Sequence, residues 1–175
     1  MPDLIADSRE LREDIGVELG QPTLDDGAAM WRLARDTKVL DLNSSYAYLM
    51  WGRDFSRTSV LATHDGRPCG FISGYLRPDQ PATLMVWQVA VAAEARGRGL
   101  AGSMLDHLVD RLRDEPGAIT HLETTITADN AASIALFSSF ARRRGADLST
   151  DQLFASEAFP DGHDAELLYR IGPFT

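Results

Sequence analysis

Residues 83–112 read TLMVWQVAVAAEARGRGLAGSMLDHLVDRL, and their pattern decides the fold of the chain. Residues 84–91 are apolar and rich in valine, which favours a half-buried strand over a helix. Along residues 100–112, apolar side chains recur at the spacing of one helix face, with Asp106 expected on the water-facing side. The order is therefore a strand, a glycine-rich basic turn and an amphipathic helix.

The turn itself, RGRGLA at residues 96–101, suits an anion. The first turn of a helix leaves backbone N–H groups without partners inside the helix, and the helix dipole makes that end partly positive. Glycines let the backbone approach a ligand closely, and the two arginines add positive charge. The spacing is neither the dinucleotide fingerprint G-x-G-x-x-G nor a Walker P-loop. Taken alone, these residues leave open an ordinary solvent-exposed turn.

Length and composition limit the class of protein. A chain of 175 residues with 44% hydrophobic residues suits one domain with a single core. Its net charge of −9 argues against nucleic acid and anionic membranes as partners. Cys69 is the one cysteine, and the 4 histidines are scattered, so we expect neither an internal disulfide nor a metal site. The sequence contains no long apolar run and no signal-peptide pattern, which predicts a soluble, cytoplasmic protein.

The remaining sequence predicts alternating helices and strands in an α/β domain. We expect a flexible acidic tail at residues 1–14 and a single domain at residues 15–175. Helices are expected near residues 27–36, 46–50, 100–112 and 131–144. Strands are expected near residues 59–63, 69–76, 84–91, 121–127, 153–159 and 167–171, with Pro78 and Pro81 separating the second from the third.

The glycine turn and the element order together resemble the GNAT acetyltransferase superfamily. Its acetyl-CoA signature, R/Q-x-x-G-x-G/A, is matched by Arg96, Gly99 and Ala101. The resemblance implies a mixed, mostly antiparallel sheet, flanked by helices, with a splayed central pair of strands that admits acetyl-CoA. It assigns CoA binding to the backbone of two strand residues and to the whole turn, namely Val89, Val91, Arg96, Gly97, Arg98, Gly99 and Ala101.

A second GNAT pattern, N-x-x-A/S-x-x-L-[YF], is matched by residues 130–137 and adds Asn130 to the expected CoA contacts. Many members of the superfamily carry a tyrosine at the last position, and its hydroxyl protonates the leaving thiolate. This chain has Phe137 there, which has no proton to give. Either another group supplies the proton, or the thiolate leaves unassisted.

Five longer segments resemble one GNAT family, the 2,4-diaminobutyrate acetyltransferases of ectoine biosynthesis. They are PTLDDGAAMW (22–31), DLNSSYAY (41–48), VWQVAV (86–91), TITADN (125–130) and HDAELLYRI (163–171). The resemblance implies that a homodimer transfers acetyl from acetyl-CoA to the γ-amine of L-2,4-diaminobutyrate, in osmoadaptation. A GNAT enzyme for another small amine, or a non-catalytic CoA-binding domain, remains an alternative.

The same resemblance implies the residues on the amine side. It carries over Asp41, Tyr46, Trp87 and Glu166 as substrate contacts, and Tyr46, His163 and Glu166 as catalytic candidates. A carboxylate suits the ammonium group that a diamine retains, because a buried cation without a partner is costly. Each position also allows a structural role: Asp41 as a helix cap, Tyr46 and Trp87 in the core, and His163 with Glu166 in solvent.

Overall fold

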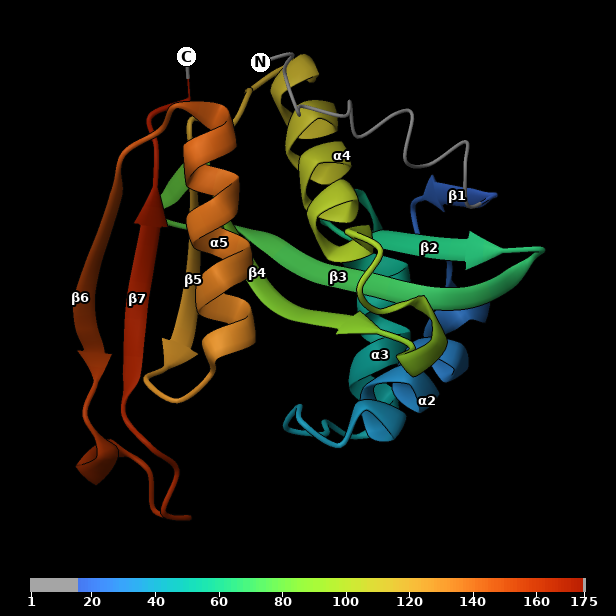
Figure 1. The fold of residues 1–175 in the computed structure, drawn as a ribbon, viewed down its shortest axis with the longest axis horizontal. Coiled ribbons are helices and arrows are strands. Elements are labelled where there is room, and N and C mark those ends of the chain that lie inside the picture. Colours follow the sequence, from blue (N-terminus) through green and yellow to red (C-terminus); the bar gives the residue numbers. More distant parts are fainter. Residues whose placement is uncertain (1–15, 175) are drawn as a thin grey trace. The chain divides into compact units, whose positions relative to one another are not determined.

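The computed structural model describes residues 16–174, which form two compact units. The first unit comprises the described residues up to Tyr75 together with Gln88–Arg111, and the second comprises the rest, including Leu76–Trp87. The predicted tail at residues 1–14 lies outside the described residues, and the predicted single domain stays a prediction. The seven strands follow the order β1-β2-β3-β4-β5-β7-β6, and β4 contributes to both units (Figure 1).

The first unit combines four strands with three helices. Its elements are β1 (Val17–Gly20), α2 (Gly27–Thr37), α3 (Ser45–Asp54), β2 (Val60–His64), most of β3 (Arg67–Arg77), the end of β4 (Gln80–Val91) and most of α4 (Leu100–Asp114). Strand β2 pairs antiparallel with both β1 and β3. The β2–β3 turn has positive φ at Asp65 (49°) and Gly66 (72°), which confirms the hairpin that Asp-Gly predicts.

Helices cover both faces of β3. Successive side chains on a strand point to opposite sides, so neighbouring residues of β3 contact different helices. A Cβ atom on Gly70 would lie 3.1 Å from the methyl carbon of Met104, so this face meets α4. The next residue, Phe71, makes an edge-to-face contact with Tyr48 of α3, with ring centroids 6.1 Å apart. Helices α2 and α3 lie against each other on that second face (Figure 1).

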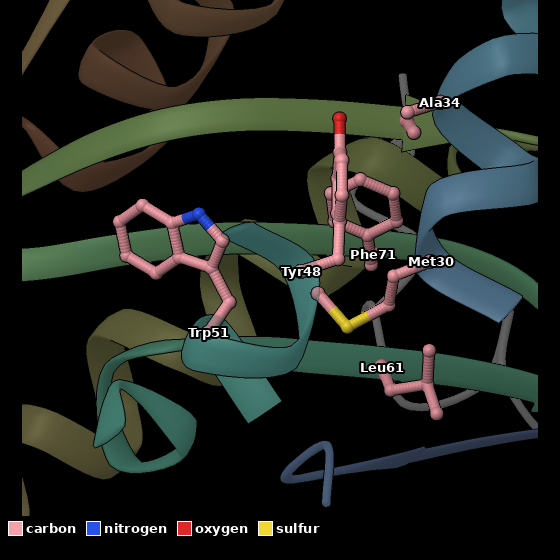
Figure 2. Close-up of a cluster of buried hydrophobic side chains, with 7 residues drawn as sticks. Met30, Ala34, Tyr48, Trp51, Leu61 and Phe71 are labelled. Atoms are coloured by element: carbon pink, nitrogen blue, oxygen red, sulfur yellow. The ribbon is translucent and has the colours of Figure 1, made fainter. Parts of the chain in front are cut away.

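The core between α2, α3 and the sheet is apolar, and Figure 2 shows most of its members. They are Met30, Ala34, Tyr48, Trp51, Leu61, Phe71 and Ala90. On α2, the side chains of Met30 and Ala34 are nearly inaccessible, and Leu33 is partly buried against the same cluster. Tyr48 is the polar exception: its ring is fully buried, and its hydroxyl lies at the end away from Met30 and Leu61 (Figure 2).

The second unit contains the first half of β4 with β5 (His121–Thr127), α5 (Ala131–Arg144), β6 (Leu148–Phe154) and β7 (Glu166–Ile171). Strands β4 and β5 form a parallel ladder from the pair Thr83–His121 to the pair Val86–Thr124. Strand β7 lies antiparallel between β5 and β6. The sheet is thus mixed and mostly antiparallel, as predicted.

A buried carboxylate links three strands of this unit. Glu123 on β5 is 2% exposed, and its Oε2 atom lies 2.9 Å from a guanidinium nitrogen of Arg77. Arg77 is the last residue of β3, whose end belongs to this unit. The other oxygen of Glu123 pairs with Arg170 of β7, which also donates to Gln80 at 3.3 Å. Two guanidinium groups therefore compensate one buried charge, which would be costly to bury alone.

Three local predictions were wrong. Strand β4 begins at Gln80 and includes Pro81, which was expected to precede the strand. The next-to-last strand, β6, spans Leu148–Phe154 and not residues 153–159. Asp106, expected to face water, is only 8% exposed. Among residues 16–174, no helix is long and apolar enough to cross a membrane.

Candidate active site

The end of β4 directs backbone groups away from β3. The N–H of Ala92 donates to the carbonyl oxygen of Cys69 on β3 at 2.8 Å. Because alternate residues of a strand bond to the same neighbour, the N–H and C=O groups of Val89 and Val91 point to the other side. We predicted that these two residues contact CoA through their backbone, and their peptide groups have the orientation that such a contact needs.

The glycine turn after β4 is open on the side of its glycines. Gly97 and Gly99 have φ values of 74° and 71°, a left-handed conformation that costs other residues about 1–2 kcal/mol. A Cβ atom built on either glycine meets nothing within 4 Å. The first helical bond of α4 runs from Ser103 N–H to Gly99 O, so the amides of residues 100–102 precede the helical ladder. The turn therefore fits a phosphate group.

The two arginines of the turn differ in what they contact. The Nε atom of Arg96 donates to the carbonyl oxygen of Val91 at 3.2 Å, which ties the turn to the end of β4. Arg98 is exposed between the two glycines. Both side chains place positive charge near the start of α4, where the helix dipole already favours an anion.

Asp41 lies in the loop between α2 and α3, as predicted. The N-cap of α3 is Ser44, so Asp41 does not have the capping role that its sequence allowed. Tyr46 lies in the first turn of α3 and is 68% exposed, so it does not belong to the core either. Both side chains are placed where a ligand can reach them.

Gln88 on β4 is not among the site residues predicted from the sequence. Its side-chain amide is buried and bonds to both Tyr48 and the backbone of Asp41. A polar residue inside an apolar, valine-rich strand was the available signal. Tyr48 was missed because its helix also offers Tyr46, and spacing alone does not say which tyrosine faces inward.

Trp87 closes the β4 segment of the second unit and is 51% exposed. Its alternation with Met85 suggested a core position, and Met85 is indeed only 9% exposed. An exposed tryptophan face on the central strand fits the predicted substrate contact, since aromatic rings attract ammonium groups.

His163 and Glu166 face each other at the start of β7. The Nε2 atom of His163 lies 3.6 Å from Oε1 of Glu166, and the two side chains are 24% and 17% exposed. The Nδ1 atom contacts the backbone oxygen of Asp164 at 2.7 Å, and a carbonyl oxygen can only accept, so Nδ1 carries the hydrogen. In the neutral ring, Nε2 then carries the lone pair. The alternative of a fully solvated histidine and glutamate does not fit this pair, because both side chains are mostly buried.

The pair is supported by strands and by an aromatic ring. Glu166 begins β7 and pairs with Thr127 of β5 on one side and Phe154 of β6 on the other. The ring of Phe159 lies against the His163 imidazole, with centroids 4.7 Å apart. Strand pairing holds the backbone of Glu166, and the Phe159 ring limits the movement of the imidazole.

Helix α5 holds the second GNAT pattern. Asn130 is its N-cap, and the side-chain oxygen accepts from Ser133 N–H at 3.1 Å. Its predicted contact with CoA is additional to this capping role and stays a prediction. Phe137 is 2% exposed, so its ring packs in the interior of the protein.

Cys69 is a core residue at 7% exposure. Burial raises the pKa of its thiol, and the carboxylate of Glu94 raises it further. Within residues 16–174, no group of three or more His, Cys, Asp or Glu side chains is arranged to hold a metal ion.

The predicted site residues divide between the two units. The first unit carries Asp41, Tyr46, Val89, Val91 and the turn at residues 96–101. The second unit carries Trp87, Asn130, His163 and Glu166. Within the units, the structure brings together His163 with Glu166, and Arg96 with Val91.

A strand that leads into a left-handed glycine turn and then a helix, within a mixed sheet, is the arrangement expected of a GNAT acetyltransferase, and the family comparison agrees with it. The profile of the Acetyltransferase (GNAT) family matches residues 27–141. L-2,4-diaminobutyric acid acetyltransferase of Streptomyces coelicolor is 58% identical over 161 residues, covering 91% of this chain and 94% of its own. The same enzyme of Streptomyces avermitilis is 54% identical over 175 residues, covering 99% and 96%.

A solved structure agrees with these sequences. Diaminobutyrate acetyltransferase EctA from Paenibacillus lautus, in complex with L-2,4-diaminobutyric acid and coenzyme A, superimposes with a TM-score of 0.84. It is 39% identical to this chain and covers 91% of it and 96% of itself. The chain belongs to the L-2,4-diaminobutyric acid acetyltransferases of the GNAT family.

Proposed function

We propose that this protein transfers the acetyl group of acetyl-CoA to the γ-amine of L-2,4-diaminobutyrate, a step of ectoine biosynthesis in osmoadaptation. The observation that carries the proposal is the likeness to EctA, whose structure contains both diaminobutyric acid and coenzyme A. The glycine turn supports it independently, because its left-handed glycines leave room for an anion at the start of α4.

CoA binding falls to the strand and the turn. The backbone of Val89 and Val91 would hold the pantetheine arm, and residues 96–101 would hold the pyrophosphate, with Asn130 as a further contact. Acetyl-CoA, when bound, supplies the thioester carbon that the amine attacks. The backbone N–H of Val89 is the candidate donor to the thioester oxygen, where negative charge develops during the reaction.

Substrate binding falls to carboxylates and aromatic rings. Asp41 and Glu166 would pair with the α-ammonium group, which keeps the α-nitrogen charged and therefore unreactive. Trp87 and Tyr46 would shape the pocket around the carbon chain. Fixing the α-carbon in this way presents the γ-nitrogen to the thioester, which converts a bimolecular encounter into a positioned reaction.

Proton removal falls to His163. An alkylammonium group has a pKa of about 10, so the γ-amine must lose a proton before it attacks. In the neutral ring the Nε2 lone pair accepts this proton, directly or through a water molecule. The Glu166 carboxylate, 3.6 Å from Nε2, then stabilises the imidazolium. Phe137 contributes no acid, so the thiolate departs without the tyrosine that many GNAT enzymes use.

A CoA-release assay over a panel of amines tests the proposal. The purified protein receives acetyl-CoA with diaminobutyrate, ornithine, lysine, putrescine or a simple monoamine, and NMR locates the acetyl group in each product. We expect the highest kcat/KM for diaminobutyrate and acetylation of the γ-nitrogen. A different preferred amine, an α-acetylated product or no thiol release would overturn the proposal.

A homodimer in the cytoplasm completes the proposal. Strand β6 ends the strand order, and all its residues are exposed, among them the apolar Leu148, Leu153 and Phe154. Edge strands of this kind are templates for pairing with another chain. Light scattering coupled to size exclusion would give the mass of two chains if the proposal holds.

Cell fractionation would test the cytoplasmic location. The acidic pI of about 4.8 is consistent with that location.

A further inference from the structure

Gln88 is a buried polar side chain on β4, where the part of this strand that belongs to the first unit begins. It lies on β4 and is 7% exposed, between Trp87, which is 51% exposed, and Val89. Both neighbours in sequence have an assigned role in the proposed reaction, and Gln88 has none. A buried amide costs free energy unless all its hydrogen-bonding groups find partners, so its partners indicate why it is there.

The two partners of Gln88 fix the orientation of its amide. The Nε2 atom donates to the backbone oxygen of Asp41 at 2.8 Å, and Oε1 lies 3.0 Å from the hydroxyl of Tyr48. A backbone oxygen can only accept, so the NH2 group must face Asp41. The amide oxygen then faces Tyr48, whose hydroxyl must donate. The three groups form a directed chain from Tyr48 through Gln88 to Asp41.

The Tyr48 end of this chain is anchored in the core. The Tyr48 ring is 0% exposed and packs edge-to-face on Phe71, inside the cluster drawn in Figure 2. Because the ring is held on all sides, its hydroxyl is a fixed reference point. The hydrogen bond from this hydroxyl restricts the side chain of Gln88 to one orientation.

The Asp41 end belongs to a loop with little regular structure of its own. Helix α2 ends at Thr37, and Lys38 follows in the left-handed conformation with φ of 58°. Helix α3 begins after its N-cap Ser44. Asp41 lies midway between these ends, and its backbone oxygen is held by Gln88.

We infer that Gln88 and Tyr48 are positioning residues that hold the Asp41 loop against β4 and thereby place the Asp41 carboxylate for the substrate ammonium. The inference rests on the proposed role of Asp41 in diaminobutyrate binding. Neither residue needs to touch substrate. The loop must be held because a displacement of about 1 Å in a substrate-binding group can cost about a hundredfold in rate.

The test uses variants that remove the bonds and keep the volume. Gln88→Met removes both hydrogen bonds, and Tyr48→Phe removes one hydroxyl. We expect Gln88→Met to raise the KM for diaminobutyrate by about tenfold to a hundredfold, with the KM for acetyl-CoA changed less than about twofold. Tyr48→Phe should have a smaller effect in the same direction. The double variant should be no worse than Gln88→Met, because the two residues act through one chain of bonds.

A control separates positioning from loss of stability. Thr58 is 6% exposed, and its hydroxyl donates to Gly74 O at 2.6 Å, a bond in which no residue of the Asp41 loop takes part. Thr58→Val should lower Tm while leaving both KM values unchanged. Hydrogen exchange of the peptide that covers residues 38–44 should accelerate in Gln88→Met and Tyr48→Phe, and not in Thr58→Val.

Three results would overturn the inference. One is an unchanged KM for diaminobutyrate in both variants, another is an equal rise in both KM values, and the third is unchanged exchange at residues 38–44. If Gln88→Met does not fold, Tyr48→Phe decides alone. Failure of the proposed function looks different: the wild-type protein would not release CoA with diaminobutyrate, or Asp41→Asn would keep its KM for diaminobutyrate.

Discussion

The Nε2 atom of His163 lies 3.6 Å from Oε1 of Glu166, so an imidazolium formed when the histidine accepts a proton would lie within ion-pair distance of the carboxylate. The other ring nitrogen is committed to the Asp164 backbone oxygen, so the tautomer is set before any substrate arrives. If His163 is the base, its replacement should change how the reaction rate depends on pH.

Replacing His163 should remove the base. His163→Gln should lower kcat by about a hundredfold to ten-thousandfold and abolish the acidic limb of the pH–rate profile, because the base whose protonation would produce that limb is removed. Steady-state kinetics from pH 5 to 10 measure both effects. The control is His64→Gln, at a side chain that is 52% exposed on β2, which should keep the wild-type profile. A variant of His163 with an intact acidic limb would contradict the assignment.

Neutralising the two carboxylates should weaken the selectivity of the enzyme for diaminobutyrate. Asp41→Asn and Glu166→Gln should lower kcat/KM for diaminobutyrate and narrow its advantage over ornithine, with the KM for acetyl-CoA little changed. Ornithine is one methylene longer, a misfit worth roughly 1–3 kcal/mol or about ten- to two-hundredfold in kcat/KM. Competition between the two amines in one assay measures the ratio directly. Wild-type kcat/KM in both variants would refute the assignment.

A side chain at Gly99 should weaken acetyl-CoA binding and leave amine binding almost unchanged. Gly99→Val forces a β-branched residue into φ of 71°, at a place where its Cβ atom would meet no atom within 4 Å apart from those of the adjacent residues. We expect a steep rise in the KM for acetyl-CoA and a small change for the amine. Gly117→Val is the matched control, because Gly117 has φ of 80° and is equally open. Calorimetric binding of acetyl-CoA that is unchanged in the folded Gly99 variant would exclude the turn as the site.

Phe137 should prove structural. Phe137→Leu should destabilise the protein by about 1–3 kcal/mol, because the ring is 2% exposed and its volume is partly lost. The alkaline limb of the kcat profile should survive, since no acid is removed. Phe140→Leu on the same helix, where the ring is 0% exposed, should behave alike. Loss of the alkaline limb in Phe137→Leu alone would mean that position 137 affects thiolate protonation.

Cys69 should resist alkylation in the folded protein. Burial, and then Glu94, raise the pKa of its thiol above the ordinary value of 9.0, so little thiolate exists at neutral pH. The folded state keeps this proton more tightly than the unfolded state. The stabilisation is therefore complete below pH 9 and is lost as pH rises through the folded pKa. Iodoacetamide labelling with and without urea, from pH 7 to 10, should show the difference.

Most of the fold could be predicted from local patterns. Strand β5 and helix α5 have the predicted bounds, His121–Thr127 and Ala131–Arg144, because β-branched residues and a clear cap and glycine stop define them. Strand β6 could not be predicted in the same way. All its residues are exposed, so its sequence LSTDQLF carries no alternation of buried and exposed positions. The aromatic residues further along misplaced it.

The site was predictable where a motif is contiguous and not where it depends on tertiary contacts. The turn at residues 96–101 has a recognisable spacing. The bond between Tyr48 and Gln88 joins residues 40 positions apart, and no local pattern distinguishes Tyr48 from the exposed Tyr46. The meeting of His163 with Glu166 also depends on how the loop before β7 folds.

Because β4 enters both units, no single cut of the backbone can divide this protein into two complete halves. A cut after Arg111 leaves the first unit whole but removes Thr83–Val86, the parallel neighbours of β5, from the second piece. During synthesis, residues 76–87 of the second unit are made before residues 88–111, which complete the first unit. The two units are thus interleaved along the chain, and any continuous fragment that contains one complete unit also contains part of the other.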